Sequence, residues 1–306
     1  MDNRERLEKL GQIVSQKKIL ILTHNNPDPD AIAAGWALRY LIRRKFKAHA
    51  ELAYGGLITR AENRAMVRLL NIDIKPLDSL NLRDFDVYGL VDTQPRAGNN
   101  SFPAYLKASI VIDHHGARKA SQEADLADIR LTYGSSTTIL TEYLLEAGLA
   151  IPKTMATALY LGLKTDTQNL GRHATDVDYR AAITLYPKVQ LKILSQIEYP
   201  DLPRDYFLDF DRGLHEAKIY GKVIFCDLGC LANTDMVALM AAFFLRFAEV
   251  SSSFVIGTSD SSLIFSLRTK KSSRFRIGDS PTPRLALPPH RIPSPEEQKA
   301  APLRAI

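Results

Sequence analysis

The chain has 306 residues, of which 45% are hydrophobic and 24% are charged, enough to build two ordinary domains with buried cores. Its two cysteines, Cys226 and Cys230, exclude a disulfide framework and a zinc site of paired cysteines, and we expect both to be buried apolar residues. The sequence has no apolar stretch of the roughly 18 residues that a spanning helix needs. Its polar first segment also lacks the apolar centre of a signal peptide. We therefore expect a cytoplasmic protein with no membrane partner.

The net charge of +6 is concentrated at the C-terminal end of the chain. Nine of the 40 Lys and Arg residues, but only three of the 34 Asp and Glu residues, lie between Arg268 and Ile306. Residues 1–267 therefore carry 31 of each sign. The sequence pI of about 9.2 reflects this tail, so we do not expect the whole molecule to attract polyanions.

Short apolar runs alternate with helical segments in the first part of the chain. The runs are too continuous for half-exposed strands and are typical of strands buried on both faces. They lie at 19–23, 48–53, 87–91 and 109–112. Helical periodicity occurs at 31–44, 60–70, 136–147 and 153–163. This alternation predicts an α/β domain over residues 1–190, with a parallel sheet and helices on both of its faces.

The composition changes beyond this domain. Prolines recur between residues 187 and 203, and we expect a linker at 191–204. Residues 205–271 are expected to form a smaller α+β domain. Its expected elements are a hairpin around Tyr220-Gly221, a helix over 234–248, and strands near 254–257 and 263–267. Residues 272–306 hold seven of the 16 prolines, which predicts a flexible tail.

Polar clusters follow three of the predicted strands at the point where each strand ends. Because the carboxyl ends of parallel strands meet at one edge of a sheet, where ligands bind, we expect the clusters to converge. Another carboxylate, Asp166, follows an apolar helical stretch and would join them. The three strand-end clusters are HNNPDPD at residues 24–30, Asp92, and the triplet Asp113-His114-His115.

Such convergence would bring several negative charges close together. Carboxylates at this separation cannot all stay ionised unless their pKa values rise or cations compensate their charge. Two divalent ions would balance four carboxylates, and two histidines would add neutral nitrogen ligands. A mixed set of imidazoles and carboxylates suits manganese, iron or zinc better than calcium. The expected ligands are His24, Asp28, Asp30, Asp92, His114 and Asp166.

Each of these residues has a simpler interpretation when it is taken alone. Asp30 is typical of an N-cap for the helix that follows it, and Asp28 before Pro29 is typical of a turn. A single His24 is more often a structural hydrogen-bonding residue than a ligand. Their joint occurrence, with an adjacent histidine pair after Asp113, favours a metal site.

Residues near the motifs could bind phosphate. Ser136 lies in a Ser-Thr run that opens a predicted helix, and this run is as typical of helix capping as of anion binding. Arg118 and Lys164 lie close to the motifs in the sequence. We expect Ser136 and Arg118 to contact substrate, although exposed basic residues are also common without such a role.

The segments HNNPDPDAIAAG, LVDTQP, VIDHHGAR and GLKTDTQ resemble, in this order, the four motifs of the DHH phosphoesterase family. That family includes RecJ-type exonucleases, bacterial oligoribonuclease/pAp phosphatases, cyclic-dinucleotide phosphodiesterases and, more distantly, manganese pyrophosphatases. The resemblance covers about residues 10–190, and less specifically residues 205–270. It implies hydrolysis of phosphoester bonds with two divalent ions, Mn²⁺ being expected and Mg²⁺ the alternative.

The resemblance also implies a role for each motif residue. Asp113 would orient a neighbouring histidine, and His115 would face the substrate phosphate as a hydrogen-bond donor or acid. Arg268, in LIFSLRT, matches an arginine of the family's small domain and would contact phosphate. The implied ligand sets share Asp92: His24, Asp28 and Asp92 for one ion, and Asp30, Asp92, His114 and Asp166 for the other.

The sequence departs from the family pattern after Arg268. Oligoribonucleases and RecJ-like members carry a glycine-rich GGH motif there, whereas this chain continues TKKSSRFRIGDSPTPRL. Glycine permits close approach of a backbone to phosphate, and proline has no amide donor. We expect hydrolysis of short oligonucleotides or nucleotide phosphates, and a homodimer is left open. The alternatives are a metal- and nucleotide-binding protein with lost or weak catalysis, and a hydrolase of phosphoanhydrides such as pyrophosphate or polyphosphate.

Overall fold

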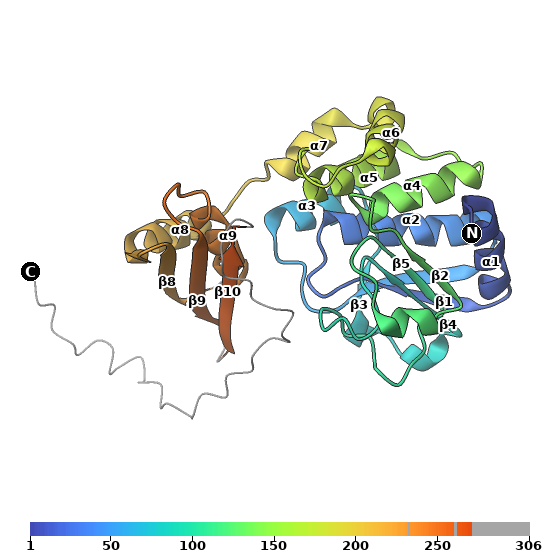
Figure 1. Ribbon diagram of the computed structural model, residues 1–306, viewed down its shortest axis with the longest axis horizontal. Coiled ribbons are helices and arrows are strands. Elements are labelled where there is room, and N and C mark those ends of the chain that lie inside the picture. The colour runs from blue at the N-terminus through green and yellow to red at the C-terminus, as the bar shows by residue number, and fades with distance from the viewer. Residues whose placement is uncertain (232, 260–261, 271–306) are drawn as a thin grey trace, which may run out of the picture.

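The structure, a computed structural model, describes residues 1–231, 233–259 and 262–270. Two sheets follow one another along the chain, each with its own hydrophobic core (Figure 1). The tail expected at 272–306 lies outside the described residues. None of the helices in the described ranges is long and apolar enough to cross a membrane.

The first sheet has six parallel strands in the order β3-β2-β1-β4-β5-β6. The order reverses direction between β1 and β4, and this is the place where parallel α/β sheets bind ligands. The short strands β3 and β6 were not predicted. The strands are β1 Lys18–Leu22, β2 His49–Tyr54, β3 Lys75–Pro76, β4 Val87–Val91, β5 Ile110–Asp113 and β6 Leu126–Ile129.

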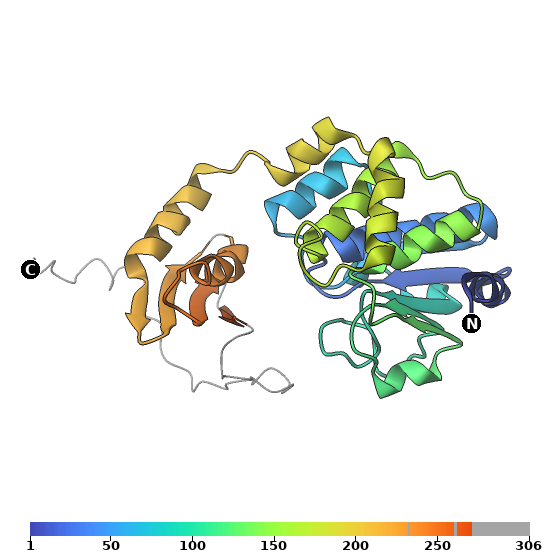
Figure 2. The same cartoon turned by 45° about the horizontal axis from the view of Figure 1, so that its top comes forward.

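Side chains alternate between the two faces of this sheet. Ile19 and Ile21 pack into the core formed with the long helices, whereas Leu20 and Leu22 pack under 3-10 helices and loops on the other face. Figure 2 shows the long helices on one side of the sheet and shorter segments on the other. This confirms the predicted α/β class. The long helices are α1 Asn3–Val14, α2 Pro29–Lys45, α4 Ser136–Glu146 and α5 Lys153–Asp166, and the 3-10 helices are Leu77–Ser79, Leu82–Asp84 and Lys119–Glu123.

Three further helices lie outside this layer: α3 Ala61–Leu69, α6 Asp176–Leu185 and α7 Leu191–Glu198. Helix α7 occupies much of the segment expected as a linker. Its Leu194 and Ile197, spaced three residues apart on one helical face, are buried in the first core. The residues between α7 and the next helix are only 199–203. The domain boundaries drawn from the sequence stay a prediction.

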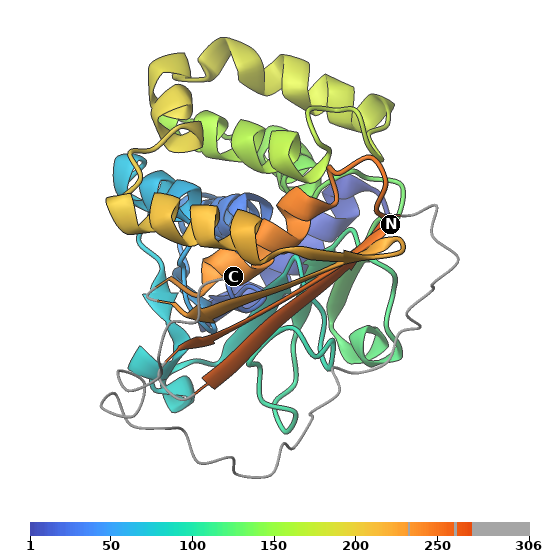
Figure 3. The same cartoon turned by 90° about the vertical axis from the view of Figure 1, so that its left-hand side faces the viewer.

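The second sheet has the order β10-β9-β8-β7. The expected hairpin is present, with Gly221 at φ +58° between β7 and β8, whereas α8 was not predicted. Figure 3 shows both helices of this unit on one side of the sheet. Cys226 is buried there as expected, but Cys230 is exposed. The elements are α8 Arg204–Glu216, β7 Lys218–Tyr220, β8 Val223–Cys230, α9 Asp235–Phe244, β9 Ser252–Ser259 and β10 Ser262–Thr269.

Candidate metal centre and interdomain cleft

The predicted polar clusters meet at the carboxyl ends of β1, β4 and β5. His24 follows β1, Asp92 follows β4, and the triplet begins with the last residue of β5. Asp28 and Asp30 lie at the start of α2, and Asp166 is the last residue of α5. The sheet order and two helix ends therefore bring residues from four parts of the sequence to one place.

Asp92 lies between two histidines. Its Oδ2 atom is 3.5 Å from His24 Nε2, and its Oδ1 atom is 3.5 Å from His114 Nε2. The Nδ1 atoms of the two rings face the carbonyl oxygens of Asn25, at 2.9 Å, and of Tyr133, at 3.3 Å. A neutral ring would therefore carry its proton on Nδ1 and present the Nε2 lone pair to Asp92. Asp92 has φ +58°, a left-handed conformation that aspartate tolerates better than most residues.

The donor atoms form groups that could each hold a metal ion, with all atoms of a group within 4.8 Å of one another. In one group, His24 Nε2 lies 3.7 Å from Asp28 Oδ1. In another, His114 Nε2 lies 3.1 Å from Asp166 Oδ2 and 4.0 Å from Asp30 Oδ2. The groups are His24, Asp28 and Asp92; Asp30, His114 and Asp166; and Asp92, Asp113, His114 and His115.

The environment of His114 fits a divalent ion. Its Nε2 atom is buried and makes no hydrogen bond to any described residue, although three carboxylates surround it. A buried polar atom without a partner needs an explanation. Donors that share one ion at about 2.1 Å lie roughly 3–4 Å apart, which is the spacing found here. The donor set therefore matches the chemistry of a divalent transition metal.

Asp30 is not the N-cap that its position in the sequence suggested. Helix α2 begins at Pro29, and Asp28 Oδ1 caps it by accepting a hydrogen bond from the Ala31 amide at 3.0 Å. The buried carboxylate of Asp30 instead accepts hydrogen bonds of 2.8 Å from the amides of Ser136 and Thr137. It therefore binds the N-terminal end of α4, more than 100 residues away in the sequence.

Ser136 makes contacts that differ from the substrate contact expected for it. The side chain is fully buried, and its Oγ donates a 2.8 Å hydrogen bond to Asp92 Oδ1, while its amide donates to Asp30. Both donors are thus used by carboxylates of the candidate centre. Ser136 orients these carboxylates in the structure rather than facing a phosphate.

Gln94 is a residue of the site that the sequence analysis missed. Its Nε2 donates to Asp113 Oδ2 at 2.7 Å, and its Oε1 accepts from the Arg118 amide at 2.7 Å and from Ser121 Oγ at 2.8 Å. The other oxygen of Asp113 lies 2.9 Å from His115 Nδ1. The histidine that Asp113 orients is therefore His115, whose side chain is 60% exposed. Its position after Asp92 was the only sequence signal for Gln94.

Asp178 is a second missed residue. It is fully buried in the first turn of α6, and its carboxylate accepts hydrogen bonds from the Gly134 amide at 2.9 and 3.0 Å and from Thr138 Oγ1 at 2.6 Å. It also accepts from the Thr175 amide at 2.8 Å. Asp178 thus holds the chain that leads into α4, whose amides bind Asp30. In the sequence it resembles an ordinary capping residue of α6.

Burial and neighbouring charges change the pKa values of the carboxylates in the candidate centre. Burial raises the pKa of Asp30 well above its ordinary value, and the charges of Asp92 and Asp166 raise it further. Burial also raises the pKa of Asp92, although His24 and His114 oppose this effect. These pKa directions mean that burial and mutual repulsion disfavour the ionised carboxylates of Asp30 and Asp92, and a bound cation would oppose both effects.

Metal binding should release protons. Burial lowers the pKa of His24, but the nearby carboxylates of Asp28 and Asp92 outweigh this and raise it to about 11. For His114, burial is outweighed by the carboxylates of Asp166, Asp30 and Asp92, and the pKa rises to about 10. Both rings then carry a proton at pH 7.5 in the metal-free protein, and both must lose it to become ligands.

We therefore expect roughly two protons to be released when the metal-free protein binds Mn²⁺ at pH 7.5, and the apparent affinity to rise with pH between 6 and 9. Isothermal calorimetry in buffers of different ionisation enthalpy measures the proton count. An affinity that does not change over this pH range would contradict the expectation.

Gly162 allows α5 to approach the start of α2. A Cβ atom at this position would lie 2.9 Å from Asp30 Cα and 3.1 Å from the Pro29 carbonyl oxygen, and neither is the flexible end of a side chain. We expect Gly162→Ala to destabilise the fold by about 1–3 kcal/mol and to weaken Mn²⁺ binding, because Asp30 must move. Thermal unfolding with and without Mn²⁺ tests this. Gly116→Ala is the control, since a Cβ there meets nothing within 4 Å; equal melting temperatures for the two variants would refute the close contact.

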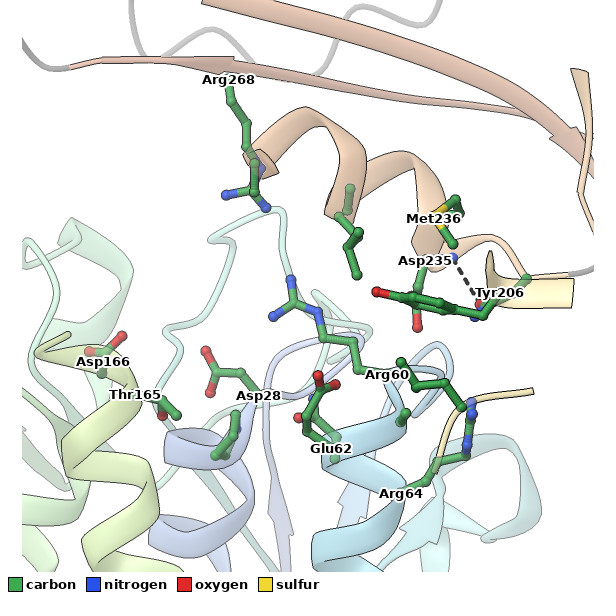
Figure 4. Close-up of a pocket in the computed structure, with 18 of the residues that line it drawn as sticks. Asp28, Arg60, Glu62, Arg64, Thr165, Asp166, Tyr206, Asp235, Met236 and Arg268 are labelled. Atoms are coloured by element: carbon green, nitrogen blue, oxygen red, sulfur yellow. Dashed lines mark hydrogen bonds between the residues drawn. The ribbon is translucent and has the colours of Figure 1, made fainter. Parts of the chain in front are cut away.

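A cleft of about 630 Å³ lies between the two domains, beside the candidate centre. Figure 4 shows Asp28, Arg60 and Asp166 on one wall and Tyr206, Asp235 and Arg268 on the other. The hydroxyl of Thr59 in the first domain donates a hydrogen bond to Asp235 of the second. Arg268, expected to bind phosphate, therefore faces the centre. Arg118 is not among the lining residues, and Lys164 pairs with Glu198 at 2.6 Å.

Two known proteins are similar to this chain in sequence. The chain is 31% identical over 283 residues to an uncharacterized protein of Methanocaldococcus jannaschii, covering 91% of this chain and 58% of that one. It is 27% identical over 199 residues to a probable manganese-dependent inorganic pyrophosphatase of Streptococcus equi subsp. zooepidemicus, covering 58% of this chain and 57% of that one. The chain thus spans little more than half the length of these two relatives.

A solved structure shows the same fold over most of the chain. It is the crystal structure of an exopolyphosphatase-related protein from Bacteroides fragilis, with a TM-score of 0.70 and 15% identity, covering 87% of this chain and 84% of that one. Residues 18–163 match the DHH family, N-terminal domain. This range contains all the candidate ligands except Asp166, which lies three residues beyond its end. These findings show that residues 18–163 of the chain are an N-terminal domain of the DHH family.

Proposed function

We propose that this chain hydrolyses phosphoester or phosphoanhydride bonds with the help of two divalent metal ions, most simply Mn²⁺. The observation that carries the proposal is the position of Asp92 between the Nε2 atoms of His24 and His114, each 3.5 Å away. A carboxylate whose two oxygens face two separate donor groups is suited to bridge two ions. One ion would be held by His24, Asp28 and Asp92, and the other by Asp30, Asp92, His114 and Asp166.

When bound, such ions polarise the phosphoryl group and activate water near neutral pH. The residues of the chain would supply orientation and a proton. Asp113 binds Nδ1 of His115, and this hydrogen bond, opposed by burial, raises the pKa of His115 above its ordinary value. The protonated ring of His115 is therefore more populated near neutral pH than that of an ordinary histidine. Its Nε2–H could donate to a phosphate oxygen or to the leaving oxygen.

Two substrate classes are compatible with the candidate centre and its cleft. Short oligonucleotides and nucleotide phosphates fit the motifs and a cleft of about 630 Å³, which is large enough for a nucleotide-sized ligand. Phosphoanhydrides are favoured by a different observation, the similarity to probable manganese-dependent inorganic pyrophosphatases over 199 residues. Both classes place a phosphate at the candidate centre, and we propose the nucleotide class first because the cleft extends beyond that centre.

A substrate panel tests the proposal. Purified protein with Mn²⁺ should hydrolyse a generic aryl phosphodiester, and comparison of dinucleotides, adenosine 3′,5′-bisphosphate and pyrophosphate would identify the class. Hydrolysis that survives EDTA, or that proceeds equally in the Asp92→Ala variant, would overturn the metal-dependent mechanism. Tight nucleotide binding without turnover over several hours would favour the alternative of a binding protein with lost catalysis.

A further inference from the structure

Gln94 is a buried amide side chain that follows β4 and lies outside the cleft. Its side-chain oxygen, Oε1, accepts hydrogen bonds from the Arg118 amide at 2.7 Å and from Ser121 Oγ at 2.8 Å. Its nitrogen, Nε2, donates to Asp113 Oδ2 at 2.7 Å and to the Gly116 carbonyl oxygen at 3.0 Å. A glutamine amide offers two donors and two acceptor positions. All four are used here, in a side chain that is only 2% exposed.

The partners of Gln94 determine which way round its amide lies. The Arg118 main-chain amide can only donate, so the side-chain oxygen must face it. The Gly116 carbonyl oxygen can only accept, so the side-chain nitrogen must face that side, where it also meets Asp113. Glutamate has almost the same shape as glutamine but would place a second acceptor against these acceptors. Position 94 therefore requires a donor towards Asp113 as well as an acceptor on the other side.

Asp113 connects Gln94 to the ring of His115. The Asp113 carboxylate is buried, and its Oδ1 atom lies 2.9 Å from His115 Nδ1. The same oxygen accepts from the main-chain amides of His114 at 2.8 Å and His115 at 3.2 Å. The hydrogen bond from Gln94 to Oδ2 prevents the carboxylate from turning. Because the His115 side chain is 60% exposed, its direction depends largely on this carboxylate.

Gln94 also holds the chain segment that follows His115. Its main-chain carbonyl oxygen accepts from Asn100 Nδ2 at 2.9 Å, and this contact secures the turn after β4. The same turn carries Asp92, the carboxylate between the two donor groups. One side chain thus joins the turn that presents Asp92 to the loop that presents His115. Its partners in that loop are Gly116, Arg118 and Ser121.

We propose that Gln94 is a positioning residue for proton donation by His115. Through Asp113, it holds the His115 ring at a fixed place relative to Asp92. This inference rests on the proposed function, because it takes His115 to act on the substrate phosphate or on the leaving oxygen. Gln94 itself would touch neither the substrate nor a metal ion. Its loss should therefore lower the turnover rate, while the binding of substrate and of Mn²⁺ stays nearly unchanged.

The first variant is Gln94→Met, which keeps the length of the side chain and removes its hydrogen bonds. The control is Gln122→Met, which changes an exposed glutamine of the 3-10 helix Lys119–Glu123. The substrate is thymidylyl-thymidine or pyrophosphate, whichever the wild type hydrolyses faster with Mn²⁺. Gln94→Met should lower kcat by about 10- to 100-fold, with KM and bound Mn²⁺ within about 2-fold of the wild type. Gln122→Met should change none of these values.

A second variant, Gln94→Glu, guards against a loss of folding. Gln94→Met leaves the Arg118 amide and the Ser121 hydroxyl without their partner, and this costs stability. Glutamate keeps an acceptor oxygen for both groups and changes only the side that faces Asp113. We expect kcat of Gln94→Glu to fall as in Gln94→Met, and its melting temperature to lie closer to that of the wild type. Wild-type kcat in both variants would overturn the proposal.

A double variant separates positioning from a general structural effect. His115→Gln alone should lower kcat by at least about 100-fold. If Gln94 acts through His115, adding Gln94→Met removes little more, and the double variant should lie within about 3-fold of His115→Gln. Two losses that multiply in the double variant would overturn the proposal, because Gln94 would then act on something other than His115.

A spectroscopic measurement keeps this test separate from that of the proposed function. Nitrogen NMR of the protein with diamagnetic Mg²⁺ shows which nitrogen of the neutral His115 ring carries the proton. We expect Nδ1 in the wild type and in Gln122→Met, and a mixture of Nδ1 and Nε2 in Gln94→Met. If neither substrate is hydrolysed but this difference is found, the positioning role stands and the proposed activity fails. The same tautomer in wild type and Gln94→Met would overturn the positioning role.

Discussion

Asp92→Ala should abolish metal-dependent hydrolysis, with a fall in kcat/KM of about 10³-fold or more. The reason is that both donor groups lose the carboxylate they share, since His24 and His114 each face one oxygen of Asp92 at 3.5 Å. The bound Mn²⁺ should fall from two ions towards one or none. Steady-state kinetics and elemental analysis of the dialysed protein would measure the two effects.

The control for this variant is Asp125→Ala. That carboxylate is exposed and pairs with Lys107 at 2.6 Å, away from the candidate centre, so both activity and metal content should stay at wild-type values. Full metal content in Asp92→Ala, with or without activity, would show that Asp92 is not a shared ligand.

Asp178→Ala should have the largest effect on stability, a loss of about 3–5 kcal/mol. The change removes a fully buried carboxylate and leaves the donors of Gly134, Thr138 and Thr175 without their partner. For a domain of roughly 150–250 residues this loss corresponds to a drop in melting temperature of roughly 6–20 °C. Gly134 precedes α4 and Thr138 lies in its first turn. Loss of these contacts should displace the α4 amides that bind Asp30, so the affinity for Mn²⁺ should fall as well.

Asp176→Ala provides the comparison, since Asp176 lies in the same first turn of α6 but is exposed. Asp176→Ala should lower the free energy of unfolding by less than about 1 kcal/mol. Asp178→Asn keeps the shape and one acceptor oxygen, so its stability should lie between those of Asp178→Ala and wild type. A melting temperature for Asp178→Ala within about 2 °C of that of Asp176→Ala would rule out the role given to this carboxylate.

Much of the first domain could be predicted because strong local patterns and the global fold agree. The buried strands of the first domain are nearly continuous apolar runs, and the polar residues His24 and Asp92 directly follow such runs. Parallel strands carry their ends to a common edge, so strand position and residue type together predicted which side chains would meet. Strand β3 has only two residues, and β6, with the sequence LADI, contains a polar residue among its four, so neither forms the continuous apolar run that identified the other strands.

The contacts that orient the site could not be predicted in the same way, because they depend on tertiary packing. Asp30 looks like a local cap, and only the packing of α2 against α4 and α5 brings it to the amides of Ser136 and Thr137. Gln94 and Asp178 carry no distinctive motif, and their roles come from partners that lie 19 to 44 residues away. Helix α7 was not predicted, because the flanking prolines outweighed two apolar positions one turn apart.

The hydrogen bonds of the site carboxylates have a consequence for how the protein matures. The amides of Ala31, Ser136 and Thr137 hold Asp28 and Asp30 with protein groups alone, and Gln94 does the same for Asp113. We therefore expect the chain to fold before any ion binds, unlike small domains that fold only around their metal. Metal binding would be a later step, and the divalent ion present in the surroundings would decide which metal is bound. Protein purified without manganese should become active when Mn²⁺ is added.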